Sequence, residues 1–177
     1  MLFQNGKLLV RKLELKDNYL LAKWLSDPIV LEYYEGRDNP FDLEKVNKKF
    51  YQRDEIGCIV VFENVEIGYI QYYQLDKESK ELYGYAEVPD IIYGMDQFIG
   101  KTEYWNRGIG TLLVKSMVEF LVKQKQADRV VMDPQTRNER ALRCYEKCGF
   151  EKVKLLPQNE LHEGEYRDCW LIEYTNI

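Results

Sequence analysis

A turn containing two glycines, between an apolar strand and an apolar helix, is suited to bind an anion. The turn is Tyr-Trp-Asn-Arg-Gly-Ile-Gly-Thr at positions 104–111. Gly108 and Gly110 allow a ligand to approach the backbone without an intervening Cβ. The first N–H groups of the following helix would face that ligand, and Arg107 adds a cation. A diphosphate is the natural occupant.

Two better-known phosphate motifs do not fit this turn. No Gly-Lys-Ser or Gly-Lys-Thr follows, which excludes a P-loop. The third glycine of a dinucleotide fingerprint is missing, and the segment lies in the middle of the chain. From these residues alone, a helix start that binds no ligand remains the alternative.

The composition is that of one globular domain spanning 1–177, with a core of ordinary size. Apolar runs stay well below the roughly 20 residues of a membrane span. The polar start is unlike a signal peptide, so a cytoplasmic protein is expected. A net charge of −5 argues against nucleic acid as the main partner, and no obligatory protein partner is evident.

The cysteines and the single histidine do not have the spacing of zinc ligands, so no metal is expected. Cys144 and Cys148 are one helical turn apart and are expected to pack as small apolar side chains. The residues concerned are Cys58, Cys144, Cys148, Cys169 and His162.

The pattern of apolar residues predicts a mixed α/β fold, with hairpins early and strand–helix alternation late. Segments 76–90 and 157–167 are expected to be mainly loop, with a possible short strand or turn at 82–85. Strands are expected over 7–13, 56–63, 67–75, 91–100, 129–134, 150–156 and 169–174, and helices over 19–25, 42–52, 112–125 and 137–147, with a short helix after Asp27-Pro28.

The segment Asn138–Phe150 carries a family resemblance. It reads Asn-Glu-Arg-Ala-Leu-Arg-Cys-Tyr-Glu-Lys-Cys-Gly-Phe and resembles the Asn-x-x-Ala-x-x-x-Tyr-x-x-x-Gly-Phe signature of the GCN5-related N-acetyltransferases. Its distance from the glycine turn, and the early Ile67-Gly68, also match. The resemblance covers nearly the whole chain and implies that family's α/β (α+β) fold, in which helices flank a central, mixed but mostly antiparallel sheet.

The resemblance also implies acetyl-coenzyme A as the acetyl donor. Backbone N–H groups of the strand before the turn would hold the acetyl carbonyl, and Tyr145 would be the general acid. A core aromatic is the alternative for Tyr145. Trp105 departs from the Gln or Arg often found at its position, which leaves the diphosphate to backbone donors and Arg107. The implied cofactor-binding residues are Gln97, Phe98, Ile99, Trp105, Asn106, Arg107, Gly108, Ile109, Gly110, Thr111 and Asn138.

A narrower resemblance is to the aminoglycoside 6'-N-acetyltransferases, including the acetyltransferase half of bifunctional acetyl- and phosphotransferase resistance enzymes. It rests on 93–100, 132–134, 160–164 and two N-terminal segments, 24–27 and 35–38. It implies a polycationic aminoglycoside as acceptor, acetylated at the 6'-amine, and a role in antibiotic resistance.

Asp96 is the leading candidate at the acceptor, because it is next to the expected acetyl site and a carboxylate can accept a proton from an amine. Whether it is the base or only anchors the ammonium stays open, and a purely structural Asp96 is a third reading. Acidic loops over 76–96 and 160–168 would attract a polycation, although such residues are often merely solvated. The candidate substrate-binding residues are Asp96, Asp133, Tyr69, Gln71, Glu81 and Glu160.

Two other functions compete with this one. The first is acetylation of a different amine, namely a protein N-terminus or a polyamine. The second is a non-catalytic module that only binds acetyl-coenzyme A. The presence of both Asp96 and Tyr145 argues against the second, and turnover with any amine would exclude it.

Overall fold

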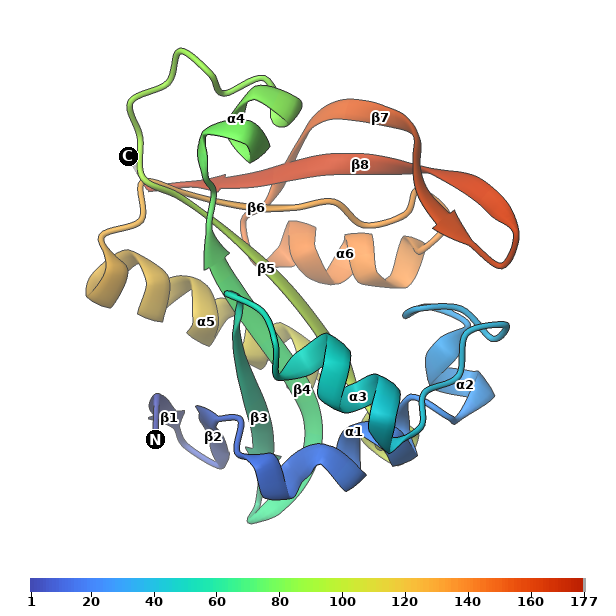
Figure 1. Ribbon diagram of the computed structural model, residues 1–177. Coiled ribbons are helices and arrows are strands. Elements are labelled where there is room, and N and C mark those ends of the chain that lie inside the picture. Colours follow the sequence, from blue (N-terminus) through green and yellow to red (C-terminus); the bar gives the residue numbers. More distant parts are fainter. Residues whose placement is uncertain (177) are drawn as a thin grey trace. The chain divides into compact units, whose positions relative to one another are not determined.

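The computed structural model describes residues 1–176, and those residues form an eight-stranded mixed sheet with helices (Figure 1). The strand order is β1-β2-β3-β4-β5-β6-β8-β7. β5 pairs with β6 in parallel, whereas β1–β2, β2–β3 and β6–β8 are antiparallel. This agrees with the expected mixed, mostly antiparallel sheet.

The strands and helices have the following bounds. The strands are β1 Phe3–Asn5, β2 Leu8–Lys12, β3 Ile56–Phe62, β4 Val65–Gln74, β5 Ile92–Ile99, β6 Arg129–Met132, β7 Glu151–His162 and β8 Glu165–Thr175. The helices are η1 Leu15–Asp17, α1 Asn18–Trp24, α2 Pro28–Leu31, α3 Leu43–Phe50, α4 Lys77–Tyr83, η2 Thr102–Tyr104, α5 Ile109–Lys125 and α6 Glu139–Lys147.

The first compact unit comprises residues 1–71, 96–110 and 162–165. In it α1 packs against α3 (Figure 1). Asp27 and Asp42 cap α2 and α3, and their carboxylates accept hydrogen bonds from the N–H groups of Ile29 and Lys45. The core of this unit joins these helices to β3, β4 and β5 and consists of Leu20, Leu21, Trp24, Leu25, Val30, Leu31, Phe41, Val46, Phe50, Ile59, Tyr69 and Phe98.

The second compact unit comprises residues 72–95, 111–161 and 166 onward. One core cluster in it is formed by Leu75, Tyr85, Ile92, Val131 and Leu171. Most of α5 belongs to this unit, and its apolar stripe is buried as the spacing predicts. The buried stripe consists of Leu113, Val114, Met117, Val118 and Leu121.

The expectation of a loop over 76–90 is wrong, because residues 77–83 form helix α4. Asp76 caps its start by accepting from the N–H of Ser79 at 2.8 Å, and Gly84 ends it in the left-handed conformation. No residue of α4 is buried, so the apolar stripe that normally reveals a helix in a sequence is missing.

The expected polar loop over 157–167 is also wrong. β7 and β8 run through it as a hairpin that turns at Glu163 and Gly164, both with positive φ. β7 is the last strand of the sheet and is exposed over nearly its whole length. It therefore lacks the apolar alternation of a half-buried strand, and Pro157 is tolerated because the strand is at an edge.

Candidate active site

The glycine turn has the backbone geometry expected of an anion site. Asn106 and Gly108 both adopt left-handed conformations, with φ of 60° and 76°, immediately before α5 begins at Ile109. Residues 106–108 are exposed, and a Cβ built on Gly108 would meet no atom within 4 Å. Alternating backbone handedness at the start of a long helix directs N–H groups outward, which suits a diphosphate.

Trp105 attaches this turn to the end of β5. Its indole Nε1 donates to the carbonyl oxygen of Ile99 at 2.8 Å, and its ring contacts Tyr33 edge-on. Arg107 is exposed, and its guanidinium lies 4.9 Å from the centre of the Tyr104 ring. Trp105, which departs from the family pattern, thus fixes the position of the turn. Arg107 places a positive charge beside it.

The strand that precedes the turn extends beyond its parallel neighbour. The register pairs Ile92, Tyr93 and Gly94 of β5 with β6, which ends at Met132, whereas β5 continues to Ile99. Residues 97–99, expected to hold the acetyl carbonyl, belong to this extension. On its β4 side, Gly68 is essential, because a Cβ there would collide with the carbonyl oxygen of Phe98.

Asp96 is held by a hydrogen-bonded network within the first unit. Gln71 Nε2 donates to Asp96 Oδ2 at 3.1 Å, and Gln71 Oε1 accepts from the Tyr69 hydroxyl at 2.9 Å. Arg53 Nη2 also donates to Gln71 Oε1, and it lies 3.0 Å from the Tyr69 hydroxyl. The structure therefore brings together Asp96, Tyr69 and Gln71, three of the residues predicted to bind the acceptor.

Aromatic rings surround this network. Phe98 packs against Tyr34 and Tyr69, and Tyr69 also contacts Phe50. Burial raises the pKa of the Tyr34 hydroxyl well above its usual value, and the charge of Asp96 raises it further. Burial also raises the pKa of Tyr69. Both phenols are thus neutral at physiological pH and remain hydrogen-bond donors.

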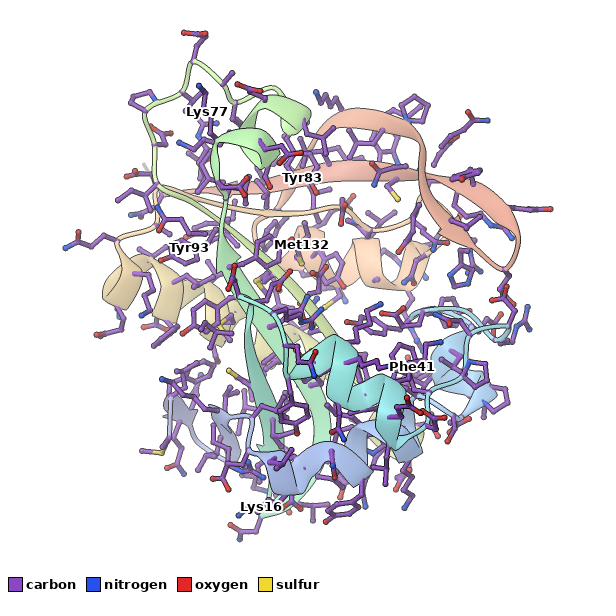
Figure 2. The ribbon with its side chains drawn as sticks, viewed as in Figure 1. Lys16, Phe41, Lys77, Tyr83, Tyr93 and Met132 are labelled. Carbon is purple, nitrogen blue, oxygen red and sulfur yellow. The ribbon has the colours of Figure 1, made fainter. Side chains whose placement is uncertain are left out.

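Asp133 has a separate set of partners in the second unit. It accepts from the Tyr83 hydroxyl at 3.0 Å and from Asn159 Nδ2 at 3.3 Å. Tyr83 is the last residue of α4 (Figure 2). Burial raises the pKa of Asp133, and these two donors lower it in part. A cation bound next to Asp133 would favour its charged form and lower its pKa.

The other predicted substrate residues are exposed parts of the same unit. Glu160 on β7 accepts from Gln135 Nε2 at 2.7 Å, and Gln135 Oε1 accepts from Arg137. Glu81 is exposed on α4. Helix α4, which was not expected, therefore carries both Glu81 and Tyr83, one of the two partners of Asp133.

Asn138 and Tyr145 both belong to α6. Asn138 is its N-cap, and its side chain accepts from the N–H of Ala141 at 3.4 Å. Tyr145 is partly buried, with its ring edge-on to Phe150 at 6.3 Å. Gly149, with φ of 95°, follows the end of the helix in the left-handed conformation. The family motif thus encodes a complete capped helix that presents Tyr145.

The two cysteines of α6 differ from each other. Cys148 is buried, as expected, but Cys144 is partly exposed, and its sulfur lies 3.4 Å from the Thr111 hydroxyl. A hydrogen bond from Cys148 lowers the pKa of Cys144 to about 6, despite partial burial. Over residues 1–176, no three His, Cys, Asp or Glu side chains gather as a metal site.

Two residues of the Asp96 network were missed at the sequence level. Arg53 follows α3 in an irregular segment, and Tyr34 follows α2. Neither belongs to a motif, and Arg53 is 18 residues from Gln71 in the chain. Arg53 can be recognised only from the tertiary structure, in which the segment after α3 lies next to β4.

Comparison with protein families gives a match to the acetyltransferase (GNAT) domain over residues 14–157, which is most of the chain. The chain belongs to the GNAT acetyltransferase family. The matched range includes both the glycine turn at 104–111 and the segment Asn138–Phe150. Among the described residues, no helix combines the length and hydropathy of a membrane span.

Two aminoglycoside-resistance relatives match this chain, one over most of its length and one over about a third of it. The aminoglycoside N(6')-acetyltransferase type 1 of Klebsiella pneumoniae is 28% identical over 84% of this chain and 76% of its own length. The kanamycin resistance protein of Rhizobium radiobacter is 39% identical, over 34% of this chain and 56% of its own.

Solved structures share the fold. Aminoglycoside acetyltransferase AAC(6')-Ib, crystallised with coenzyme A and kanamycin, superposes with a TM-score of 0.77 at 24% identity, covering 96% of this chain and 95% of its own. Spermidine N-acetyltransferase from Vibrio cholerae, with coenzyme A and spermine, has a TM-score of 0.75 at 17% identity, covering 97% and 96%. The same fold thus occurs in a structure bound to kanamycin and in one bound to spermine.

Proposed function

We propose that this chain acts as a single N-acetyltransferase domain that transfers acetyl from acetyl-coenzyme A to the 6'-amine of aminoglycosides, and so confers resistance. The observation that carries the proposal is Asp96, a carboxylate held by Gln71 on the β5 segment that leads to the glycine turn. The similarity to N(6')-acetyltransferases over most of the chain supports it.

Acetyl-coenzyme A would be held by the turn and by β5. The open, left-handed backbone at Asn106 and Gly108 fits a diphosphate, with Arg107 as an added cation. Backbone N–H groups of Gln97, Phe98 and Ile99 would polarise the thioester carbonyl, and one such donor is typically worth about 3 kcal/mol. The bound donor supplies the acetyl group and a thiolate leaving group.

The acceptor would be recognised by carboxylates. Asp96 would bind the 6'-ammonium and accept its proton directly or through water. The other amines of an aminoglycoside would be attracted by Asp133, Glu81 and Glu160. Tyr145 would return a proton to the departing thiolate, because a phenol of ordinary pKa ~10 is still protonated at neutral pH and therefore has a proton to give.

A polyamine is the second candidate acceptor. The spermidine acetyltransferase of Vibrio cholerae has the same fold, and acidic residues would attract a linear polycation equally well. An aminoglycoside is favoured because the similarity in sequence is to aminoglycoside enzymes.

A panel of amines tests the assignment. Thiol release from acetyl-coenzyme A is followed with kanamycin, spermidine and a peptide with a free N-terminus, at equal amine concentration. We expect kanamycin to give a kcat/KM at least about tenfold above the others, or 1.4 kcal/mol. Turnover of spermidine or peptide without turnover of kanamycin would refute the aminoglycoside assignment, and an absence of any turnover would refute the enzyme.

A further inference from the structure

We infer that Arg53 is a positioning residue for the acceptor site: through the side-chain amide of Gln71, it orients Asp96 and places a permanent positive charge behind that carboxylate. The inference deepens the proposed function, on which it rests for the role of Asp96. It concerns an arginine from an irregular segment that no motif of the chain includes.

The direction of the hydrogen bonds carries the argument. Gln71 Oε1 accepts from both Arg53 Nη2 and the Tyr69 hydroxyl, which leaves Nε2 to donate to Asp96 Oδ2 at 3.1 Å. Turning the amide over would place its NH₂ against two donors and its oxygen against a carboxylate. The amide is therefore fixed in one orientation, with its donor directed at Asp96.

Arg53 is itself held firmly. Its guanidinium carbon lies 4.8 Å from the centre of the Phe50 ring, and its side chain is only 19% exposed. Nη2 also donates to the Tyr69 hydroxyl at 3.0 Å, while Nε lies 3.8 Å from a Glu55 carboxylate oxygen. A guanidinium stays charged at every physiological pH. Partial burial strengthens its effect on nearby charges.

Two phenols near Asp96 carry no charge. The hydroxyls of Tyr34 and Tyr69 are neutral, because burial raises both pKa values. The charge of Glu35 also raises the pKa of Tyr34, and the Glu35 carboxylate is paired with Lys49 at 2.6 Å. Within this set, Arg53 is the cation that acts on Asp96 through Gln71.

Gln71→Glu tests the inference with almost no change in volume. The new carboxylate still accepts from Arg53 and Tyr69, but it faces Asp96 with an oxygen in place of the amide donor. Two adjacent carboxylates hold a shared proton. The acid limb of kcat/KM for kanamycin should therefore move to higher pH by about one pH unit or more, since a base must be unprotonated to work.

Arg53→Lys is the second variant, because it keeps the charge and removes the planar fork. Arg53→Lys should move the acid limb of kcat/KM for kanamycin to higher pH, by less than Gln71→Glu does. It should leave KM for acetyl-coenzyme A unchanged. Arg11→Lys is the matched control. Arg11 also forms a two-bond pair within the first unit, with Asp17 at 2.8 Å. Arg11→Lys should lower Tm without moving the acid limb of kcat/KM for kanamycin.

A titration of the free protein separates this inference from the proposed function. The Asp96 side-chain carbonyl is followed by ¹³C NMR without substrate and assigned by its absence in Asp96→Asn. Its titration midpoint should rise in Gln71→Glu and in Arg53→Lys. A midpoint in Arg53→Lys equal to that of the wild type would overturn the positioning role of Arg53, even if kanamycin is acetylated. A raised midpoint in Arg53→Lys would uphold it, even if the acceptor proves to be another amine.

Discussion

Replacing Asp96 by Asn removes its charge and leaves its shape. Gln71 Nε2 donates to Oδ2 at 3.1 Å, and an asparagine oxygen accepts the same bond, so the local structure should persist. An ammonium about 4 Å from a carboxylate gains roughly 4 kcal/mol at an effective dielectric constant of 20. Asp96 is partly exposed, and solvent reduces this gain. We therefore expect about 2.7 kcal/mol, a hundredfold fall in kcat/KM for kanamycin.

The assay is thiol release with kanamycin at fixed pH and two ionic strengths. Asp42→Asn is the matched control, because Asp42 caps α3 and asparagine caps as well as aspartate. Both variants remove one negative charge, so a general loss of electrostatic attraction would affect them equally. A fall of less than about tenfold in folded Asp96→Asn, or an equal fall in the control, would refute the role of Asp96 as anchor or base.

Three further variants probe other parts of the molecule. Tyr145→Phe keeps the ring packing on Phe150 and should slow single-turnover acetyl transfer by about a hundredfold with unchanged acetyl-coenzyme A affinity; an unchanged rate would remove Tyr145 as the acid. Gly110→Val, in the first turn of α5, should weaken acetyl-coenzyme A binding at least tenfold, about 1.4 kcal/mol. An unaltered affinity, measured by calorimetry in a folded variant, would contradict the assignment of the turn as the diphosphate site. Arg11→Met should lower the free energy of unfolding by about 3 kcal/mol at pH 7. Burial alone would raise the pKa of Asp17, but the hydrogen bond from Arg11 holds it below its usual value, so the stabilisation is present at neutral pH and is lost as pH falls below about 4; a wild type–variant gap in urea unfolding that stays constant down to pH 2 would disprove this linkage.

The local elements of the fold could be predicted because their signals are local. The glycine turn, the stripe of α5 and the cap-to-glycine pattern of α6 each depend on residues within one or two helical turns. Asp27-Pro28 encodes the start of α2 in the same way, with its carboxylate on the N–H of Ile29.

The loops that were wrongly expected over 76–90 and 157–167 have one physical cause. Helix α4 and strand β7 are both exposed, so neither carries the apolar period that burial imposes on a sequence. Their signals are Asp76 and Gly84 for the helix, and Glu163-Gly164 for the hairpin turn. Caps and turns are weaker signals than a stripe, because the same residues are common in loops.

The candidate site could be predicted only where it follows the family motifs. Asp96 was found from its place next to the expected acetyl site, and Gln71 was named among the candidate substrate-binding residues. Arg53 reaches Gln71 across 18 residues of chain, and that contact depends on how α3 packs against β4. Tertiary contacts of this kind leave no periodic trace in the sequence.

The regiochemistry of the product tests the central claim most directly. Kanamycin acetylated by the wild-type protein is isolated, and the acetylated nitrogen is assigned by NMR. With the 6'-ammonium at Asp96, we predict acetyl on the 6' nitrogen alone, and no N-acetylation of aminoglycosides that carry a hydroxyl at that position. Acetyl on a 2-deoxystreptamine nitrogen would contradict the proposed pose.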